Sequence, residues 1–338
     1  MAQRPKLAVI LGAGASHDVC PDAGPIKSPE WRPPLVNTMF QGGTFDIVLE
    51  NHPEAQALMS SLRTRVRAGD SFEETLRRYL DDSAPYIQRQ MAFVPIALHE
   101  FFYRVSTNFT TEAINYSHLV NCTVGQGVHT AFVTVNYDTL LEMSLGKITG
   151  IYQGTLDSYV SSPDWLLVKL HGSVGWGYPW RSTQRTTSLR IAAQSNELPR
   201  RDAAHIRVGL PPGQMYSEDT LFYPALSLPV AGKYGFVCPP SHVEALERFM
   251  ADCHNFLFVG FSANDQDLLD FLNKTVKQVE RLAVVTSQRD LVAVTNRLFE
   301  AVPELMRGGS DADNNVPTLG FTWYLENRID PFVASLSA

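Results

Sequence analysis

Short continuous apolar runs recur along the chain and alternate with helical patterns. The first run is KLAVIL at residues 6–11, and the others lie at residues 130–135, 165–170, 255–259 and 282–286. Runs of this length are typical of strands buried on both faces of a parallel sheet. Amphipathic helical patterns occur at residues 241–252, 264–277 and 289–300. This alternation predicts an α/β fold, with a Rossmann-like, doubly wound, mainly parallel sheet.

Residues 44–124 show helical spacing instead. Residues 71–81 open with a serine and a glutamate at capping-box spacing, and apolar residues recur at helical intervals over residues 86–108. We therefore expect a helical insertion subdomain at residues 44–124. Residues 1–43 and 125–338 would then form the Rossmann-like domain.

Two later segments fit neither regular pattern clearly. Residues 177–215 are rich in Arg, Ser, Thr, Gln and Pro, which predicts a long mobile excursion. Residues 320–324 carry a last short apolar pattern, for which we expect a strand at the edge of the sheet.

The charge and hydropathy of the chain restrict the classes of partner that the protein can bind. The chain holds 28 Lys and Arg residues against 35 Asp and Glu residues, for a net charge of −7 at pH 7. Because non-specific nucleic-acid binding needs a basic surface, we expect no direct nucleic-acid binding. No stretch approaches the roughly 18 apolar residues that cross a bilayer. The N-terminus has no signal-peptide pattern, so we expect a soluble, cytoplasmic protein with no membrane contact.

The four cysteines, Cys20, Cys122, Cys238 and Cys253, form no CxxC pair. Their spacing gives no basis for a zinc ribbon, so no metal site is predicted. Isolated cysteines in a chain of this size are typical of reduced cytosolic thiols.

Polar residues follow the first two apolar runs. The segment GAGAS follows the first run at residues 12–16, where glycines let backbone N–H groups approach a phosphate. A plain strand-to-helix turn explains this segment equally well, because the full G-x-G-x-x-G spacing is absent. Asn136 and Asp138 follow the second run, and the amide of Asn136 offers both a donor and an acceptor. Asp138 by itself is also explained as a helix N-cap.

Two further polar segments end later runs. A lone histidine is more often structural than catalytic, but His171 at a strand end can act as a general base near neutral pH. Gly260 and Ser262 can approach a phosphate or ribose, and Asp265 or Asp267 can accept ribose hydroxyls. Helix capping by Ser262 or Asn264 is the alternative, and it is compatible with a binding role. In open α/β sheets ligands bind outside the carboxyl ends of strands, so the four segments together predict one ligand site.

Together these segments resemble the sirtuin superfamily, and more closely its bacterial zinc-free branch. Residues 12–16 resemble the GAGxS loop that holds the NAD pyrophosphate in sirtuins. Asn136 and Asp138 match the Asn-x-Asp of the nicotinamide pocket, and His171 with the following glycine matches the catalytic His-Gly. Residues 260–267 (GFSANDQD) resemble a segment typical of the bacterial branch.

The chain departs from the deacylating sirtuins in two respects. It lacks the two CxxC pairs that hold a zinc ion, and the Pro-Asp-Phe-Arg segment is replaced by CPDA at residues 20–23. The resemblance therefore implies a zinc-free protein.

The resemblance implies an NAD hydrolase that cleaves the nicotinamide–ribose bond of NAD, its substrate. It assigns catalysis to Asn136 and His171. It assigns NAD binding to Gly12, Ala13, Gly14, Ser16, Asp138, Gly260, Ser262 and Asp265. It also implies bacterial antiphage defence by abortive infection, a homo-oligomer, and a partner that is a helicase-like ATPase or an Argonaute-type sensor.

Three alternatives remain open. An NAD-dependent protein deacylase would need a channel for an acylated lysine. A non-catalytic, NAD-binding assembly subunit would use residues 44–124 for oligomerisation or for a partner. Transfer or cyclisation of ADP-ribose would use the same site residues as hydrolysis.

Overall fold

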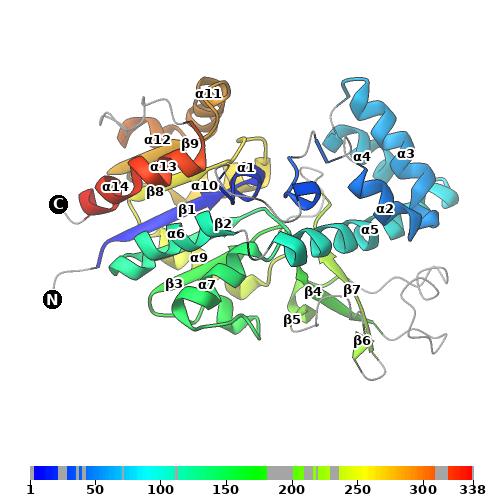
Figure 1. Ribbon diagram of the computed structural model, residues 1–338, viewed down its shortest axis with the longest axis horizontal. Coiled ribbons are helices and arrows are strands. Elements are labelled where there is room, and N and C mark those ends of the chain that lie inside the picture. The colour runs from blue at the N-terminus through cyan, green and yellow to red at the C-terminus, as the bar shows by residue number, and fades with distance from the viewer. Residues whose placement is uncertain are drawn as a thin grey trace.

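A five-stranded sheet lies at the centre of the part of the computed structural model that Figure 1 shows on the left. Its order is β3-β2-β1-β8-β9, and all neighbouring strands are parallel. The strands are β1 (Lys6–Leu11), β2 (His129–Thr134), β3 (Trp165–Lys169), β8 (Asn255–Val259) and β9 (Arg281–Val285). The structure describes residues 4–21, 29–35, 38–39, 43–70, 72–109, 111, 113–180, 201–208, 216–217, 220–228, 236–308 and 319–336.

Burial of the strands explains their unbroken apolar runs. All residues of β3 and β8 are buried, and β1, β2 and β9 leave only their first residue partly exposed. The chain runs from β1 outward through β2 to β3, and then adds β8 and β9 on the other side of β1. The carboxyl ends of β1 and β8 therefore flank the point where the strand order reverses, which is where such sheets form a crevice.

Helices cover both faces of the sheet. On one face, α6, α7, α13 and α14 form a contiguous layer, in which α6 contacts the other three. On the other face α9 packs on β3, and an ion pair joins α9 to α10, while α11 and α12 pack beside β9. The helices are α6 (Ile114–Cys122), α7 (Leu140–Thr149), α9 (Pro240–Met250), α10 (Gln266–Thr275), α11 (Leu291–Ala301), α12 (Pro303–Gly308), α13 (Phe321–Asn327) and α14 (Ile329–Ser335). The predicted doubly wound, mainly parallel α/β fold is confirmed.

The other part of the molecule, at the right of Figure 1, combines helices with a small antiparallel sheet. Helix α5 contacts α2, α3 and α4 and also packs on β4 and β7, and the Tyr223 hydroxyl donates to the carbonyl oxygen of Ala92 at 2.7 Å. The sheet has the order β5-β4-β7-β6. The elements are α2 (Thr44–Glu50), α3 (Pro53–Arg67), α4 (Phe72–Asp81), α5 (Pro85–Phe109), β4 (Gly172–Trp180), β5 (Arg207–Val208), β6 (Tyr216–Ser217) and β7 (Thr220–Leu226).

Two expectations were wrong. The described parts of residues 177–215 include the end of β4 and all of β5, so this segment is not simply an excursion; residues 181–200 and 209–215 lie outside the described residues. Residues 320–324 begin helix α13 and not an edge strand, because Asp18 accepts hydrogen bonds from the N–H groups of Phe321 (2.6 Å) and Thr322 (3.1 Å) and so caps the helix. Neither cap nor antiparallel pairing is visible in a local hydrophobic pattern.

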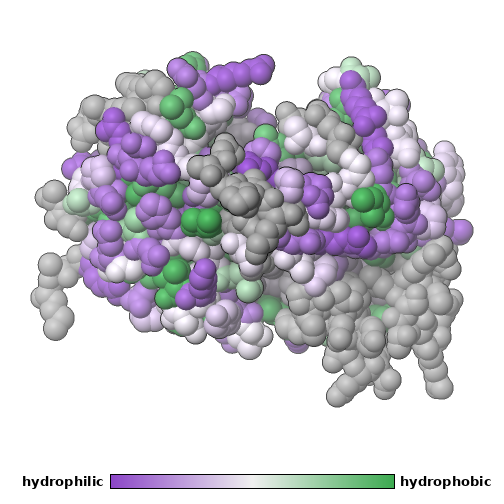
Figure 2. All heavy atoms as spheres, in the orientation of Figure 1, coloured by the Kyte–Doolittle hydropathy of each residue, from purple (hydrophilic) through white to green (hydrophobic). Residues whose placement is uncertain are grey.

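The surface is mixed in character. On the face shown in Figure 2, hydrophobic residues form small separate groups among hydrophilic ones. Within the described part of the chain, no helix is both long enough and apolar enough to span a bilayer.

Candidate functional site

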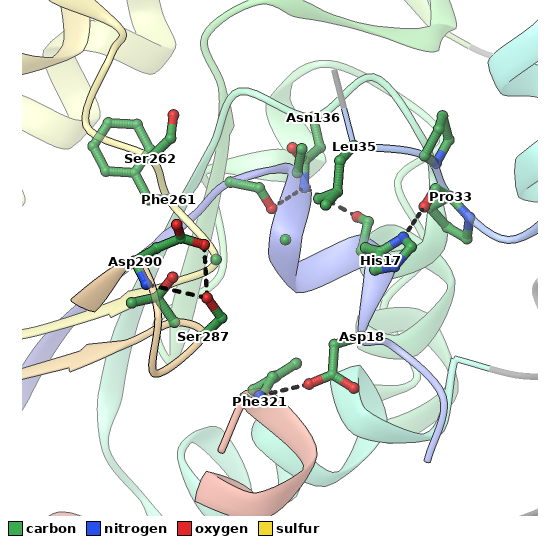
Figure 3. Close-up of a pocket in the computed structure, with 18 of the residues that line it drawn as sticks. His17, Asp18, Pro33, Leu35, Asn136, Phe261, Ser262, Ser287, Asp290 and Phe321 are labelled. Atoms are coloured by element: carbon green, nitrogen blue, oxygen red, sulfur yellow. Dashed lines mark hydrogen bonds between the residues drawn. The ribbon is translucent and has the colours of Figure 1, made fainter. Parts of the chain in front are cut away.

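A cleft of about 1590 Å³ lies at the carboxyl ends of the parallel strands. Its walls come from the loops after β1, β2, β3, β8 and β9, from the α3–α4 turn, from α5 and from the start of α13. Figure 3 shows part of this cleft, with Asn136, Ser262 and Asp290 on loops from three different strands. It is lined by all ten residues that the resemblance assigns to catalysis or NAD binding: Gly12, Ala13, Gly14, Ser16, Asn136, Asp138, His171, Gly260, Ser262 and Asp265. Asp267, the alternative to Asp265 as a ribose contact, is not among the residues that line the cleft.

The glycines bring two loops into backbone contact. The N–H of Gly12 donates to the Val259 carbonyl at 3.0 Å, and the N–H of Gly14 donates to the Gly260 carbonyl at 2.9 Å. A Cβ atom on Gly12 would lie 2.5 Å from the oxygen of Gly260. Gly260 has φ +57°, and a Cβ there would lie 2.1 Å from the nitrogen of Ala15. The glycines are therefore required by this close approach, whatever the loop also binds.

Ser16 and Asn136 join the loop after β1 to the loop after β2. The Asn136 side-chain amide donates to the Gly12 carbonyl at 2.8 Å and to the Ser16 hydroxyl at 3.0 Å. Ser16, on helix α1 (Ala13–His17), is 2 % exposed and donates to Oδ2 of Asp138 at 2.8 Å. Both Asn136 amide hydrogens are thus used within the protein, which leaves Oδ1 as the acceptor atom of a side chain that lines the cleft.

Asp138 anchors this hydrogen-bond network to the start of helix α7. Its side chain is buried, and Oδ1 accepts a hydrogen bond from the Leu140 N–H at 3.1 Å in the first turn of α7. The capping role that the sequence suggested is therefore present. Sequence reasoning missed Tyr116 of α6, whose hydroxyl lies 2.7 Å from Ser16 Oγ. Burial, with the nearby Asp138 carboxylate, raises the pKa of Tyr116 well above its usual value.

His171 lies against Asp265. Nε2 of His171 is 2.8 Å from Oδ2 of Asp265, and the two side chains are 14 % and 15 % exposed. The other Asp265 oxygen accepts from the Leu268 N–H at 2.8 Å and caps α10. Burial would raise the pKa of Asp265, but the hydrogen bond and charge of His171, together with the Leu268 N–H, outweigh it and lower the pKa. Both oxygens of Asp265 therefore already have partners.

The backbone around His171 is tightly held. The His171 carbonyl accepts from the Ser227 N–H at 2.9 Å, and the Leu170 N–H donates to the Thr134 carbonyl at 3.0 Å. Gly172 follows with φ +85°, and a Cβ there would lie 1.9 Å from the oxygen of Ala225. The glycine after the histidine is thus needed where the chain passes from the parallel sheet into the antiparallel one.

A buried ion pair, which the sequence analysis did not predict, stabilises the ends of β3 and of the loop after β2. Lys169 and Glu142 lie 2.7 Å apart with side chains 1 % and 6 % exposed. Lys169 also donates to the Asp138 carbonyl, and the Ser173 hydroxyl donates to Glu142 at 3.1 Å. The pair links the end of β3 to the first turn of α7, and the bond from Lys169 to Asp138 ties the same strand end to the loop after β2. The sequence signal was an apolar strand ending in lysine, but its partner 27 residues earlier could not be identified from spacing.

The rest of the rim comes from distant segments. Figure 3 shows His17 beside Pro33, and Asp18 bonded to the N–H of Phe321. Arg297 of α11 donates to the Ser262 carbonyl at 2.7 and 3.0 Å, which leaves the Ser262 hydroxyl exposed at the cleft. Across the part of the chain that the structure covers, no cluster of three or more His, Cys, Asp or Glu side chains is suited to hold a metal ion.

The structure is that of a doubly wound α/β protein with a cleft at the carboxyl edge of its parallel sheet. A SIR2-like domain model matches residues 130–301, just over half of the chain, so the chain belongs to the SIR2-like domain family. The match includes Asn136, His171 and Asp265 and begins after the GAGAS turn. Family membership implies an NAD-dependent enzyme.

Other comparisons add little. A structure solved to explain the mechanism and regulation of Sir2 enzymes is similar over 98 % of this chain and 94 % of that chain, at 14 % identity and a TM-score of 0.40. No curated protein matches the chain.

Proposed function

We propose that this protein is an NAD hydrolase that cleaves the bond between nicotinamide and ribose, giving nicotinamide and ADP-ribose. The observation that carries the proposal is the meeting of Asn136, His171 and the Gly12–Gly14 turn in one cleft. Glycine turns at strand ends suit a pyrophosphate, and a histidine beside them suits proton transfer.

Hydrolysis of the nicotinamide–ribose bond requires few protein groups. As the bond breaks, its electron pair goes to the pyridinium nitrogen, nicotinamide leaves neutral, and positive charge develops on the ribose. Water then adds to the anomeric carbon and its proton passes to His171. Asn136 would orient the water or a ribose hydroxyl through Oδ1, because its amide hydrogens already bind Gly12 and Ser16. Holding water and ribose in this geometry lowers the entropic part of the barrier.

The binding roles follow from exposure and from existing bonds. The N–H groups of Gly12 and Gly14 already bind Val259 and Gly260, so the N–H of Ala13 in this turn would face the pyrophosphate, and the exposed Ser262 hydroxyl would face a ribose or phosphate. Asp138 would act through Ser16 to hold Asn136, since its carboxylate oxygens bond to Ser16 and Leu140.

The experiment measures NAD loss by the purified chain without any peptide. His171→Ala and Asn136→Ala should each lower turnover by about 10²- to 10⁴-fold, the usual cost of losing a positioned acid, base or water-binding group. His254→Ala is the matched control, because His254 also faces a carboxylate, Glu280 at 3.2 Å, but lies outside the residues that line the cleft. Near wild-type turnover in both cleft variants would overturn the proposal.

Product analysis separates the alternatives. Mass spectrometry distinguishes linear from cyclic ADP-ribose. Turnover that appears only with an acetylated peptide would identify a deacylase. A chain that binds NAD without consuming it, alone or with its partner, would be an assembly subunit.

We propose also that this activity depletes NAD in the cytoplasm during bacterial antiphage defence, in a homo-oligomer that pairs with a helicase-like ATPase or an Argonaute-type sensor. The motif resemblance supports this role. Sizing the protein alone and with the product of the adjacent gene tests the assembly, and NAD levels in infected cells that carry His171→Ala test the role.

A further inference from the structure

We propose that Asp265 is a positioning residue which fixes His171 as its Nε2–H tautomer, so that Nδ1 is the nitrogen available as the base. This inference rests on the proposed hydrolase function. It changes the role of Asp265, which the sequence resemblance assigned to NAD binding.

The contact spans the cleft. His171 follows β3 and Asp265 follows β8, and these strands are separated by β2 and β1. Three strand spacings amount to roughly 14 Å, so the 2.8 Å contact exists only because both loops lean across the sheet edge. Both loops must therefore be held in place for His171 and Asp265 to stay in contact.

Both ends are supported. On one side, the His171 carbonyl binds the Ser227 N–H, and Gly172 makes the tight passage into β4. On the other side, Oδ1 of Asp265 caps α10 through Leu268, which leaves Oδ2 to face His171. Helix α10 thus aims the carboxylate at the imidazole ring.

The short distance indicates which nitrogen carries the proton. A bare ring nitrogen and a carboxylate oxygen repel one another, so the 2.8 Å contact requires a proton on Nε2 of His171 in the neutral as well as in the protonated ring. With the proton on Nε2, a neutral imidazole carries its lone pair on Nδ1. In the described residues, Nδ1 of His171 has no hydrogen-bond partner and is not buried, so it is accessible to water or ribose.

Asp265→Asn tests this without removing the helix cap, because asparagine caps helices as well as aspartate does. Its carbonyl oxygen still accepts from Leu268, while its amide now donates to Nε2 and forces the proton onto Nδ1. In a serine protease triad, the same exchange leaves the geometry intact and lowers kcat about 10⁴-fold. We expect a loss of kcat on the order of 10³- to 10⁴-fold, with KM for NAD changed less than about threefold.

The matched controls lie on the same helix and at the same position. Asp270→Asn changes an exposed carboxylate of α10 that accepts a hydrogen bond from Gln266 of the same helix, and should leave kcat unchanged. Asp265→Ser retains a capping oxygen but no longer reaches His171, and should lose less kcat than Asp265→Asn because neither tautomer is enforced.

Two measurements do not depend on turnover. Nitrogen-15 NMR of histidine-labelled protein, with His171→Ala to assign the signal among nine histidines, should show Nε2–H in the wild type and Nδ1–H in Asp265→Asn. Calorimetry with ADP-ribose should give the same affinity for both proteins. An unchanged tautomer, or ADP-ribose binding weakened tenfold or more by Asp265→Asn, would overturn the positioning role and restore a ribose contact.

Failure of the two proposals is distinguishable. If the wild type consumes no NAD but shows the expected tautomer switch, the hydrolase assignment fails and the His171–Asp265 pair stands. If the wild type consumes NAD and Asp265→Asn does so equally well, only the positioning role fails.

Discussion

Ser16 accepts a hydrogen bond from the side chain of Asn136 at 3.0 Å, across 120 residues of sequence. The serine faces inward, so the GAGAS turn contributes a structural anchor as well as a glycine backbone. The residue proposed to orient water is therefore held by the loop proposed to hold the pyrophosphate.

Ser16→Ala should weaken both stability and turnover. It removes a partner from Asn136, Asp138 and Tyr116, and each buried polar group left unpaired costs about 1–3 kcal/mol. Urea unfolding and NAD turnover measure the two effects. Ser61→Ala is the control, because Ser61 also pairs with a tyrosine, Tyr79 at 2.6 Å, but at an exposed site. Equal stability of the two variants would contradict the anchoring role.

Gly260→Ala should disrupt the contact between the two glycine loops. The positive φ alone costs roughly 1–2 kcal/mol for a residue with a Cβ, and the 2.1 Å approach to Ala15 adds to that. Thermal unfolding and ADP-ribose calorimetry should show lower stability and weaker binding. Gly154→Ala, with nothing within 4 Å of its added Cβ, should change neither. A Gly260→Ala protein that behaves like Gly154→Ala would show that the loops do not need this approach.

Removing only one member of the Lys169–Glu142 ion pair should lower the free energy of unfolding more than removing both charges. Lys169→Met leaves a buried carboxylate without its cation, at a cost of about 3–5 kcal/mol. Adding Glu142→Gln to Lys169→Met removes the unpaired charge, so part of the stability should return. Urea unfolding of the single and double variants measures this coupling. A double variant no more stable than Lys169→Met would contradict it.

The free energy of unfolding should also fall as the pH is lowered, because His99 is buried in its neutral form. Burial lowers the pKa of His99 to about 4, although its bond to the Val174 carbonyl and the charge of Glu100 raise it, against 6.5 for an exposed histidine. Well above pH 6.5 the ring is neutral in the folded and in the unfolded chain, so the contribution of His99 to the free energy of unfolding is complete. As the pH falls from 6.5 toward 4, the unfolded chain takes up a proton and the folded one does not, so stability is lost, at most about 1.4 kcal/mol per pH unit.

The measurement compares urea unfolding near pH 7 and near pH 5 for the wild type and His99→Gln, whose amide can still donate to Val174. The variant should lose roughly 2 kcal/mol less than the wild type over this interval. An equal loss in both proteins would assign the acid sensitivity to other groups.

The local sequence pattern was sufficient to predict the parallel sheet and to select polar residues that meet at one edge of it. Continuous apolar runs are expected wherever both faces of a strand are covered, and polar residues at the ends of such strands must meet at one edge because the strands are parallel. Asn136, His171 and the glycine turns could be selected on that ground alone. Asp18 and Tyr116 could not, because a capping carboxylate and a buried hydroxyl look like any other polar residue until their partners are placed.

The amino-acid sequence by itself determined the strand and helix periods, the turns that only glycine can make, and the polar residues that follow the strands. Only the tertiary structure decided that residues 172–180 and 220–226 pair into a second sheet, that Phe321 begins a helix, and that Asp265 contacts His171. The reason is physical: periodicity and backbone freedom act over neighbouring residues, whereas hydrogen-bond partners are chosen by long-range packing that brings distant segments within 3 Å.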